Sequence, residues 1–291
     1  MSSTAPAPTT IPDLPQITIP PTSPQHTHTV IFLHGRGDTA RGFTAALHAW
    51  HDSLGRTLFS TFPSFRWVIP QAPLRPMAST ATSWRPQGEV RHQWFDVWNV
   101  RDFADREEMQ LEGLREVIPA VRALIRREAE MLGGRWDRVL LAGISMGAAT
   151  SVHTIFNLDV PAEGGGRLGA FLGFCARCPF RGRDLKGMRE VMALGEGVPE
   201  GNEVLRRTPM MLQHCVDDPL VLIEWGRGLR DILRGFGAQV EWREYEKGGH
   251  WFKDPEGLDD LVEFVKRVVL GKGESEGGQG QLVEDGAMDL S

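Results

Sequence analysis

One short segment, VLLAGISMGAAT at residues 139–150, restricts the possible folds most strongly. Its first four residues are apolar and predict a buried strand, and the small residues at its end predict the start of a helix. Between them, Gly143 to Gly147 form the pattern G-x-S-x-G. This pattern is typical of a sharp strand-to-helix turn that exposes a nucleophilic serine. Residues two before and two after the serine crowd such a turn and must be nearly free of side chain, which the two glycines satisfy.

The pattern alone is a weak signal in a chain with 33 glycines. The strand before it and the helix after it favour the functional interpretation, because both are needed to build the turn. We therefore predict that Ser145 is a nucleophile.

The composition is that of one large globular domain. The chain has 291 residues, of which 41% are hydrophobic and 24% charged, which suits a single α/β core. Its net charge is −6 and it has no long basic run, so no nucleic-acid partner is expected. No apolar run is long enough to cross a membrane, and the N-terminus lacks the pattern of a signal peptide or a myristoylation site. We predict a cytoplasmic protein with at most transient contact with a membrane surface.

Three cysteines are an odd and small number, which fits reduced thiols better than a disulfide framework. Cys175 and Cys178 form a C-x-x-C pair, which occurs in redox sites and in zinc sites. No second such pair and no pair of histidines follows at the spacing of a zinc finger. Packed thiols are the preferred interpretation, and neither a metal nor another cofactor is predicted.

The chain divides into three parts. Residues 1–27 are rich in Pro, Thr and Ser and predict a flexible arm, with a short edge strand at 17–19 as the alternative. Residues 28–270 form the predicted domain, and residues 271–291 a disordered tail rich in Gly and Glu.

In the domain, apolar runs predict strands at 29–33, 66–70, 139–142, 169–174, 209–214 and 239–245. Helices are predicted at 102–131, 145–157, 185–194, 220–236 and 258–270. This alternation indicates a mostly parallel sheet with helices on both faces.

The first strand of the domain runs into His34-Gly35-Arg36-Gly37-Asp38. In hydrolases built around a serine turn, a loop at this place supplies a backbone amide to the oxyanion hole. Arg36 is the candidate donor through its N–H. The alternative is a tight turn with Asp38 as the N-cap of the next helix, and both interpretations are compatible.

A serine hydroxyl needs a base to take its proton and a carboxylate to orient that base. In this architecture the chain order is serine, acid, histidine. Three histidines follow Ser145: His153 on the next predicted helix, His214 at the end of a strand, and His250 in a glycine-flanked loop. We predict His250 as the base, because a loop between the last strand and the last helix can place it over the serine.

Asp217 and Asp218 follow the predicted strand at 209–214, at the sheet edge where sites gather. We favour Asp218 as the acid, because Pro219 holds its backbone extended and opens the next helix. Asp217 is then a cap or a spectator.

A long irregular segment is predicted from Leu74 to Gln93, closed by an aromatic cluster at 94–98. Loops of this length without secondary structure are often lids or binding loops. We predict that residues 74–98 form an apolar acyl groove, with core packing under the loop as the alternative for any single aromatic residue. A short groove with a polar mouth is a further alternative, given by the charged residues Arg36, Arg75, Arg85, Glu89 and Arg91. The predicted substrate-binding residues are Leu74, Met77, Trp84, Trp94 and Phe95.

Several segments together resemble the acyl-protein thioesterase, carboxylesterase and lysophospholipase family of α/β-hydrolases. They are FLHGRGDT at 32–39, IPQAP at 69–73, WFD at 94–96, GISMG at 143–147, HCVDDPLV at 214–221 and GH at 249–250. The resemblance implies an α/β-hydrolase fold and a triad of Ser145, Asp218 and His250. It also implies an oxyanion hole formed by the amides of Arg36 and Met146. The family commonly has an apolar residue where Arg36 stands and Gln where Met146 stands.

The expected function is hydrolysis of acyl thioesters or carboxylic esters through an acyl-enzyme on Ser145. The expected substrates are acylated proteins or small esters, and the expected oligomeric state is a monomer or weak homodimer. One alternative is a short-chain general carboxylesterase or lysophospholipase. A second alternative, from another class, is a hydrolase-fold binding protein without catalysis.

Overall fold

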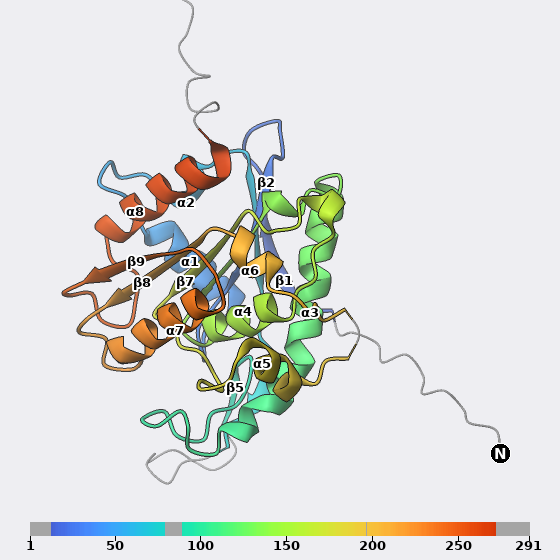
Figure 1. Cartoon of the computed structure of the whole chain (residues 1–291). Helices are drawn as coiled ribbons and strands as arrows, with labels where there is room; N and C mark the ends of the chain where they lie inside the picture. The colour runs from blue at the N-terminus through green and yellow to red at the C-terminus, as the bar shows by residue number, and fades with distance from the viewer. Residues whose placement is uncertain (1–12, 79–88, 196, 272–291) are drawn as a thin grey trace, which may run out of the picture.

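The computed structural model describes residues 13–78, 89–195 and 197–271 (Figure 1). A seven-stranded sheet with the order β1-β3-β2-β6-β7-β8-β9 lies at its centre. The six parallel strands are β2 (His28–Leu33), β3 (Phe65–Pro70), β6 (Val139–Ile144), β7 (Ala170–Phe174), β8 (Met210–Cys215) and β9 (Val240–Tyr245). β1 (Gln16–Ile19) pairs with β3 in the antiparallel direction at one edge. The mostly parallel sheet predicted from the sequence is confirmed.

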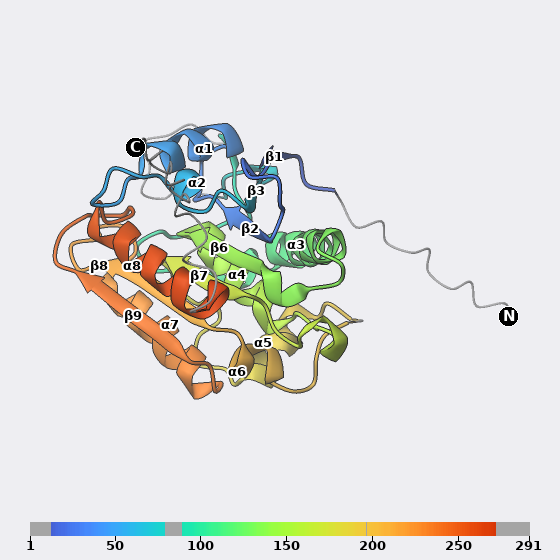
Figure 2. The ribbon, with the colours of Figure 1, turned by 90° about the horizontal axis from the view of Figure 1, so that it is seen from above.

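Helices cover both faces of this sheet (Figure 2). On one face lie α1 (Ala40–Ala49), α2 (Leu58–Thr61) and α8 (Glu256–Val265), which continues into a π-helical turn at Lys266–Leu270. On the other face lie α3 (Gln110–Met131), α4 (Met146–Phe156), α5 (Leu185–Met192), α6 (Glu203–Arg207) and α7 (Ile223–Gly235). Short 3-10 helices occupy Glu107–Met109, Trp136–Arg138 and Ala162–Gly164.

The apolar runs of the strands follow from these two helical layers. In β2, Val30 and Phe32 pack with α1 and α8, whereas Ile31 and Leu33 face the layer that contains α3 and α4. Successive side chains of a strand point to opposite faces, so a strand covered on both faces must be apolar throughout. β2 and β6 lie next to each other and are fully buried. The loops that follow these two strands therefore start from a rigid position at the carboxyl edge of the sheet.

The structure differs from the sequence prediction at several elements. The arm predicted for residues 1–27 contains β1, and Leu14 is buried in the core, so the ordered domain begins before residue 28. Pairing with β3 forms a strand there despite the Pro-rich composition, in agreement with the edge strand given as the alternative. The helix predicted from residue 102 begins at Gln110, after a 3-10 turn. Helix α6 was not predicted, because its five residues are too few to show a helical period.

The segment predicted to be irregular contains a two-stranded ribbon. β4 (Leu74–Pro76) and β5 (Val90–His92) pair in the antiparallel direction. Three-residue strands give too few alternations for a sequence signal. Residues 79–88, which include Trp84, lie outside the described residues, as do the ends of the chain at 1–12 and 272–291.

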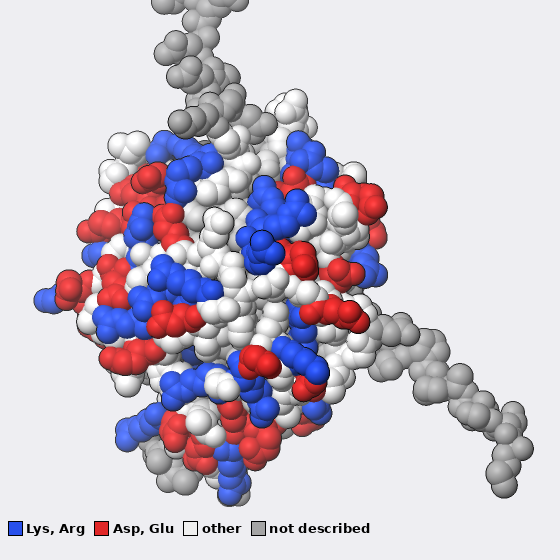
Figure 3. Space-filling model, in the orientation of Figure 1, with Lys and Arg blue, Asp and Glu red and all other residues white. Residues whose placement is uncertain are grey.

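Two surface properties bear on possible partners. None of the described helices is both long and apolar enough to span a membrane. On the face drawn in Figure 3, acidic and basic side chains are interspersed.

Helix α3 packs against the segment after β5 through a glycine. A Cβ atom on Gly113 would lie 2.5 Å from Cα of Phe95 and 2.7 Å from the carbonyl oxygen of Trp94. Real Cβ atoms do not approach backbone atoms this closely, so the helix needs glycine to reach its position. Gly228 in α7 provides a contrast, because a Cβ atom there would meet no atom within 4 Å.

We expect Gly113→Ala to lower the free energy of unfolding by about 1 to 3 kcal/mol, because overpacking outweighs the gain in helix propensity. Gly228→Ala should raise it by about 0.5 to 1 kcal/mol, since only the propensity changes. Chemical denaturation of both variants measures the difference. Equal effects of the two substitutions would contradict the close packing of α3.

Candidate active site

Ser145 lies in a strained turn between β6 and α4. Its φ is 55° and its ψ is −121°, a conformation that side chains rarely adopt. A Cβ atom on Gly143 would lie 2.6 Å from the nitrogen of Ala148, and one on Gly147 would overlap the carbonyl oxygens of Leu33 and His34. The turn therefore requires glycine at both positions, as the sequence pattern indicated.

The loop after β2 is held by the imidazole of His34. This ring is fully buried, and burial lowers its pKa, which favours the neutral form. Nδ1 donates to the carbonyl oxygen of Gly35 over 2.8 Å, and Nε2 accepts from the amide of Ala72 over 3.1 Å. The carbonyl of Gly35 and the amide of Arg36 belong to one peptide plane, so the ring fixes the direction of that amide.

Met146 is the first residue of α4, and its amide is one of the first-turn groups without an intrahelical carbonyl partner. Met146 and Arg36 line the same cavity as Ser145. Thr39, rather than the predicted Asp38, is the N-cap of α1 and accepts from the amide of Gly42. Asp38 accepts from the amide of Thr39 instead.

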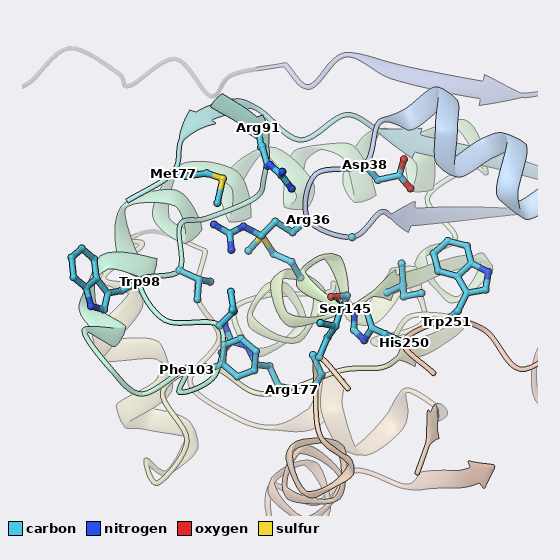
Figure 4. A pocket seen from close by; sticks show the side chains of 17 residues that line it. Arg36, Asp38, Met77, Arg91, Trp98, Phe103, Ser145, Arg177, His250 and Trp251 are labelled. Atoms are coloured by element: carbon cyan, nitrogen blue, oxygen red, sulfur yellow. Dashed lines mark hydrogen bonds between the residues drawn. The ribbon is translucent and has the colours of Figure 1, made fainter. Parts of the chain in front are cut away.

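Three side chains from three loops meet beside this turn. Nε2 of His250 lies 2.8 Å from Oγ of Ser145, and Nδ1 of His250 lies 2.7 Å from Oδ2 of Asp218. The structure thus brings together the three residues that the sequence analysis selected. Figure 4 shows Ser145 and His250 side by side at the wall of the cavity.

The carboxylate of Asp218 is fully buried and accepts hydrogen bonds on both oxygens. Oδ1 accepts from the amides of Leu220 and Val221, each over 2.9 Å. Oδ2 faces His250 and also Nε2 of His214, at 3.2 Å. Burial raises the pKa of Asp218, but the hydrogen bonds from the two histidines outweigh it and hold the pKa far below its usual value. Asp218 is therefore a carboxylate at neutral pH.

His214 was not predicted to touch this carboxylate. Its side chain is fully buried, and Nε2 also lies 2.7 Å from the carbonyl oxygen of Val221. A histidine four residues before an aspartate at a strand end only weakly predicts a contact between the two, because the turn after β8 decides whether their side chains meet.

Asp217 has a structural partner that the sequence analysis missed. Its Oδ1 accepts from the amides of Gly248 and Gly249, over 3.0 and 2.8 Å. These glycines precede His250 and have φ values of 157° and 64°. Asp217 is therefore neither a helix cap nor a spectator: it anchors the loop that carries the histidine.

A cavity of about 530 Å³ opens beside Ser145. Its wall is largely apolar; the apolar side chains are Met77, Val97, Trp98, Val100, Phe103, Ile144, Met146, Leu220, Val221 and Trp251. Such a cavity is large enough for a small ligand or part of an acyl chain.

Of the predicted substrate-binding residues that the structure describes, only Met77 lines this cavity. Trp94 and Phe95 are fully buried in the core, where Trp94 donates to the carbonyl oxygen of His34 over 2.8 Å. They support the wall from behind, which is the core-packing alternative. Leu74 points to solvent on the ribbon with 62% of its surface exposed, and Trp84 lies outside the described residues. Trp98 belongs to the aromatic cluster predicted to contribute to the groove, and it lines the cavity. Phe103 and Trp251 also line the cavity but were not selected, since aromatic residues carry no sequence signal for the face they occupy.

The described residues contain one group with metal-ligand spacing: Cys175, Asp218 and His250, whose ligand atoms lie within 4.8 Å of one another. Both ring nitrogens of His250 already engage Asp218 and Ser145. Burial raises the pKa of the Cys175 thiol well above its usual value, which disfavours the thiolate that a metal requires. Cys178 is also buried and lies outside this group. The geometry therefore favours acid–base chemistry on Ser145 over metal binding.

The chain is similar to curated acyl-protein thioesterases. It is 28% identical to acyl-protein thioesterase 1 of Gibberella zeae over 252 residues, which cover 86% of this chain and 94% of the relative. It is also 28% identical to acyl-protein thioesterase 1 of Cryptococcus neoformans over 206 residues, 71% of this chain and 67% of the relative.

The fold is similar to that of solved esterases. The crystal structure of acyl-protein thioesterase 2 from Zea mays superposes with a TM-score of 0.65 at 22% identity, over 88% of this chain and 99% of that one. The family model described as phospholipase/carboxylesterase matches residues 15–182, more than half of the chain. With its serine turn, its mostly parallel sheet and this match, the chain belongs to the phospholipase/carboxylesterase family of α/β-hydrolases.

Proposed function

We propose that this protein is a serine hydrolase that cleaves acyl thioesters or carboxylic esters, with Ser145 as nucleophile, His250 as base and Asp218 as acid. The observation that carries the proposal is the continuous hydrogen-bonded path from Asp218 through both ring nitrogens of His250 to Oγ of Ser145, at 2.7 and 2.8 Å. A base in this position takes the proton of the serine hydroxyl as it attacks an acyl carbonyl.

The low pKa of Asp218 supports its role. A carboxylate that stays ionised next to Nδ1 fixes the tautomer of His250 and stabilises the imidazolium formed during attack. The amides of Arg36 and Met146 are the proposed oxyanion donors, and the rigid peptide plane between Gly35 and Arg36 supports this assignment.

The reaction proceeds through an acyl-enzyme. Ser145 attacks the carbonyl carbon, the protonated His250 releases its proton to the departing group, and a water molecule activated by His250 then frees the acid. A thiolate leaves with little protonation, because its parent pKa is about 8.5, whereas an alkoxide needs the proton of His250. The same residues serve both reactions, so esters and thioesters are both proposed substrates. The proposed acyl carriers are proteins or small molecules, in line with the thioesterase names of the relatives.

A hydrolase-fold protein that only binds its ligand is the alternative from another class. It is disfavoured, because a binding protein has no need of a hydrogen-bonded serine at a strained turn. Covalent labelling by a serine-directed fluorophosphonate separates the two: an enzyme is labelled at Ser145, and a binding protein is not.

We expect Ser145→Ala to lower kcat/KM by about 10⁴-fold or more for both an oxygen ester and a thioester of the same acyl group. The folded state should keep its stability, since only one small hydroxyl is removed. Steady-state rates with the matched pair of substrates measure the loss. A variant that keeps more than about a tenth of the wild-type rate would show that another residue is the nucleophile.

We expect Asp218→Asn to lower kcat by about 10⁴-fold, because an amide cannot hold the productive tautomer of His250. Asp217→Asn is the matched control: its side-chain oxygen still accepts from the glycine amides, so the loss should stay below about tenfold. The same ester assay measures both variants. A larger loss for Asp217→Asn than for Asp218→Asn would refute the assignment of the acid.

A further inference from the structure

Among the described residues, three arginines line the cavity beside Ser145, and two of them have acidic partners. Arg36 faces Asp96 at 3.6 Å, and Arg91 faces Glu89 at 2.7 Å. The third, Arg177, forms no ion pair with any described residue. The largely apolar wall, which also carries the carboxylate of Asp38, thus holds one positive charge that forms no ion pair within the described part of the protein.

Arg177 is 4% exposed and follows β7 in the loop that contains the C-x-x-C pattern. Its Cζ lies 4.1 Å from the ring centre of Phe103 and 5.6 Å from that of Phe95. Nη2 donates to Oε1 of Gln110 over 2.8 Å, whereas Nη1 is buried and has no hydrogen-bond partner among the described residues. A buried charged group with an unpaired hydrogen-bond donor lowers the stability of the folded protein. The presence of Arg177 at this position therefore calls for a functional explanation.

The guanidinium is charged at neutral pH. Burial lowers the pKa of Arg177 to about 10, and the carboxyl of Glu107 opposes this shift. The amide of Phe180 donates to that carboxyl over 2.6 Å. Among the described residues, the direct contacts that stabilise the charge are two aromatic rings and one neutral amide oxygen.

The position of Arg177 relative to Ser145 indicates which part of a substrate it meets. In Figure 4, His250 and Trp251 lie on one side of Ser145, and Phe103 and Arg177 lie on the other. His250 delivers the proton to the departing group, so that group must lie on the His250 side. The acyl group then extends toward Phe103 and Arg177.

We propose that Arg177 forms a subsite for a carboxylate at the far end of the acyl group, so that the preferred substrates are monoesters or monothioesters of dicarboxylic acids. This inference rests on the proposed function of Ser145. The methylene chain contacts the apolar wall, and the terminal carboxylate accepts a hydrogen bond from the guanidinium. Charge-assisted hydrogen bonds of this kind gain strength in a site with little water.

The test uses p-nitrophenyl monoesters of dicarboxylic acids with about four to ten carbons, each compared with its methyl-capped neutral diester. The wild-type protein should show a kcat/KM for the charged substrate about tenfold or more above that for the neutral one at the best length. Arg177→Met should lower kcat/KM for the charged substrate about tenfold or more relative to that for the neutral ester, so that the preference is lost. Arg177→Lys should keep part of the preference, because the charge remains.

Arg181→Met is the matched control. Arg181 lies on the same loop and its Cζ stacks over Trp225 at 3.9 Å, but it is not among the residues that line the cavity. This variant should keep the wild-type ratio of charged to neutral substrate. A purely structural role of Arg177 would change both rates together and leave the ratio unaltered, which would overturn the proposal.

A measurement on the wild-type protein alone covers the case in which Arg177→Met does not fold. Free dicarboxylates should inhibit hydrolysis of a neutral ester about tenfold more strongly than monocarboxylates of the same length. Equal inhibition, or a wild-type preference for neutral esters, would overturn the carboxylate subsite. If neutral esters are still hydrolysed and this activity depends on Ser145, the proposed function stands even though the carboxylate subsite is refuted. Failure of the subsite and failure of the proposed function are therefore distinguishable.

Discussion

The backbone of Ser145, held at a φ of 55° between β6 and α4, is the constraint on which the rest of the site depends. The turn exists only because β6 and β2 are neighbouring buried strands and because Gly147 lets α4 begin against the carbonyl oxygens of Leu33 and His34. The same contact places the loop after β2 next to the serine. Strain of this kind persists only where the surrounding structure determines it, and the two helical layers supply that rigidity.

Around this turn, the buried side chains of His34 and Asp218 and the exposed side chain of Asp217 fix the loops that carry the proposed catalytic residues. His34 holds the peptide plane before Arg36, Asp218 accepts from four donors, and Asp217 holds the two glycines before His250. Each bond satisfies a group that would otherwise be costly to bury or would leave a loop free to move. These interactions do not involve Ser145 itself, but they hold the groups around it in position before a substrate binds.

The cavity combines a largely apolar wall with an arginine that forms no ion pair with any described residue. Its volume and its apolar residues suit an acyl chain, whereas Arg177 would bind a negative charge. A cation in such a cavity would determine which acyl chains are preferred. An anionic chain would pair with the guanidinium, whereas a neutral chain would leave it without a partner.

The sequence by itself determined the layered α/β architecture, the serine turn and the selection of Ser145, Asp218 and His250. Strands buried on both faces must be apolar throughout, glycines mark the strained turn, and chain order restricts the acid and the base. Only the tertiary structure decided that Trp94 and Phe95 lie in the core, that Leu74 faces solvent, and that His214 and Asp217 support the site. It also placed Arg177 at the cavity wall. These outcomes depend on which distant elements meet, and a local pattern of residue types carries no information about contacts between segments far apart in the chain.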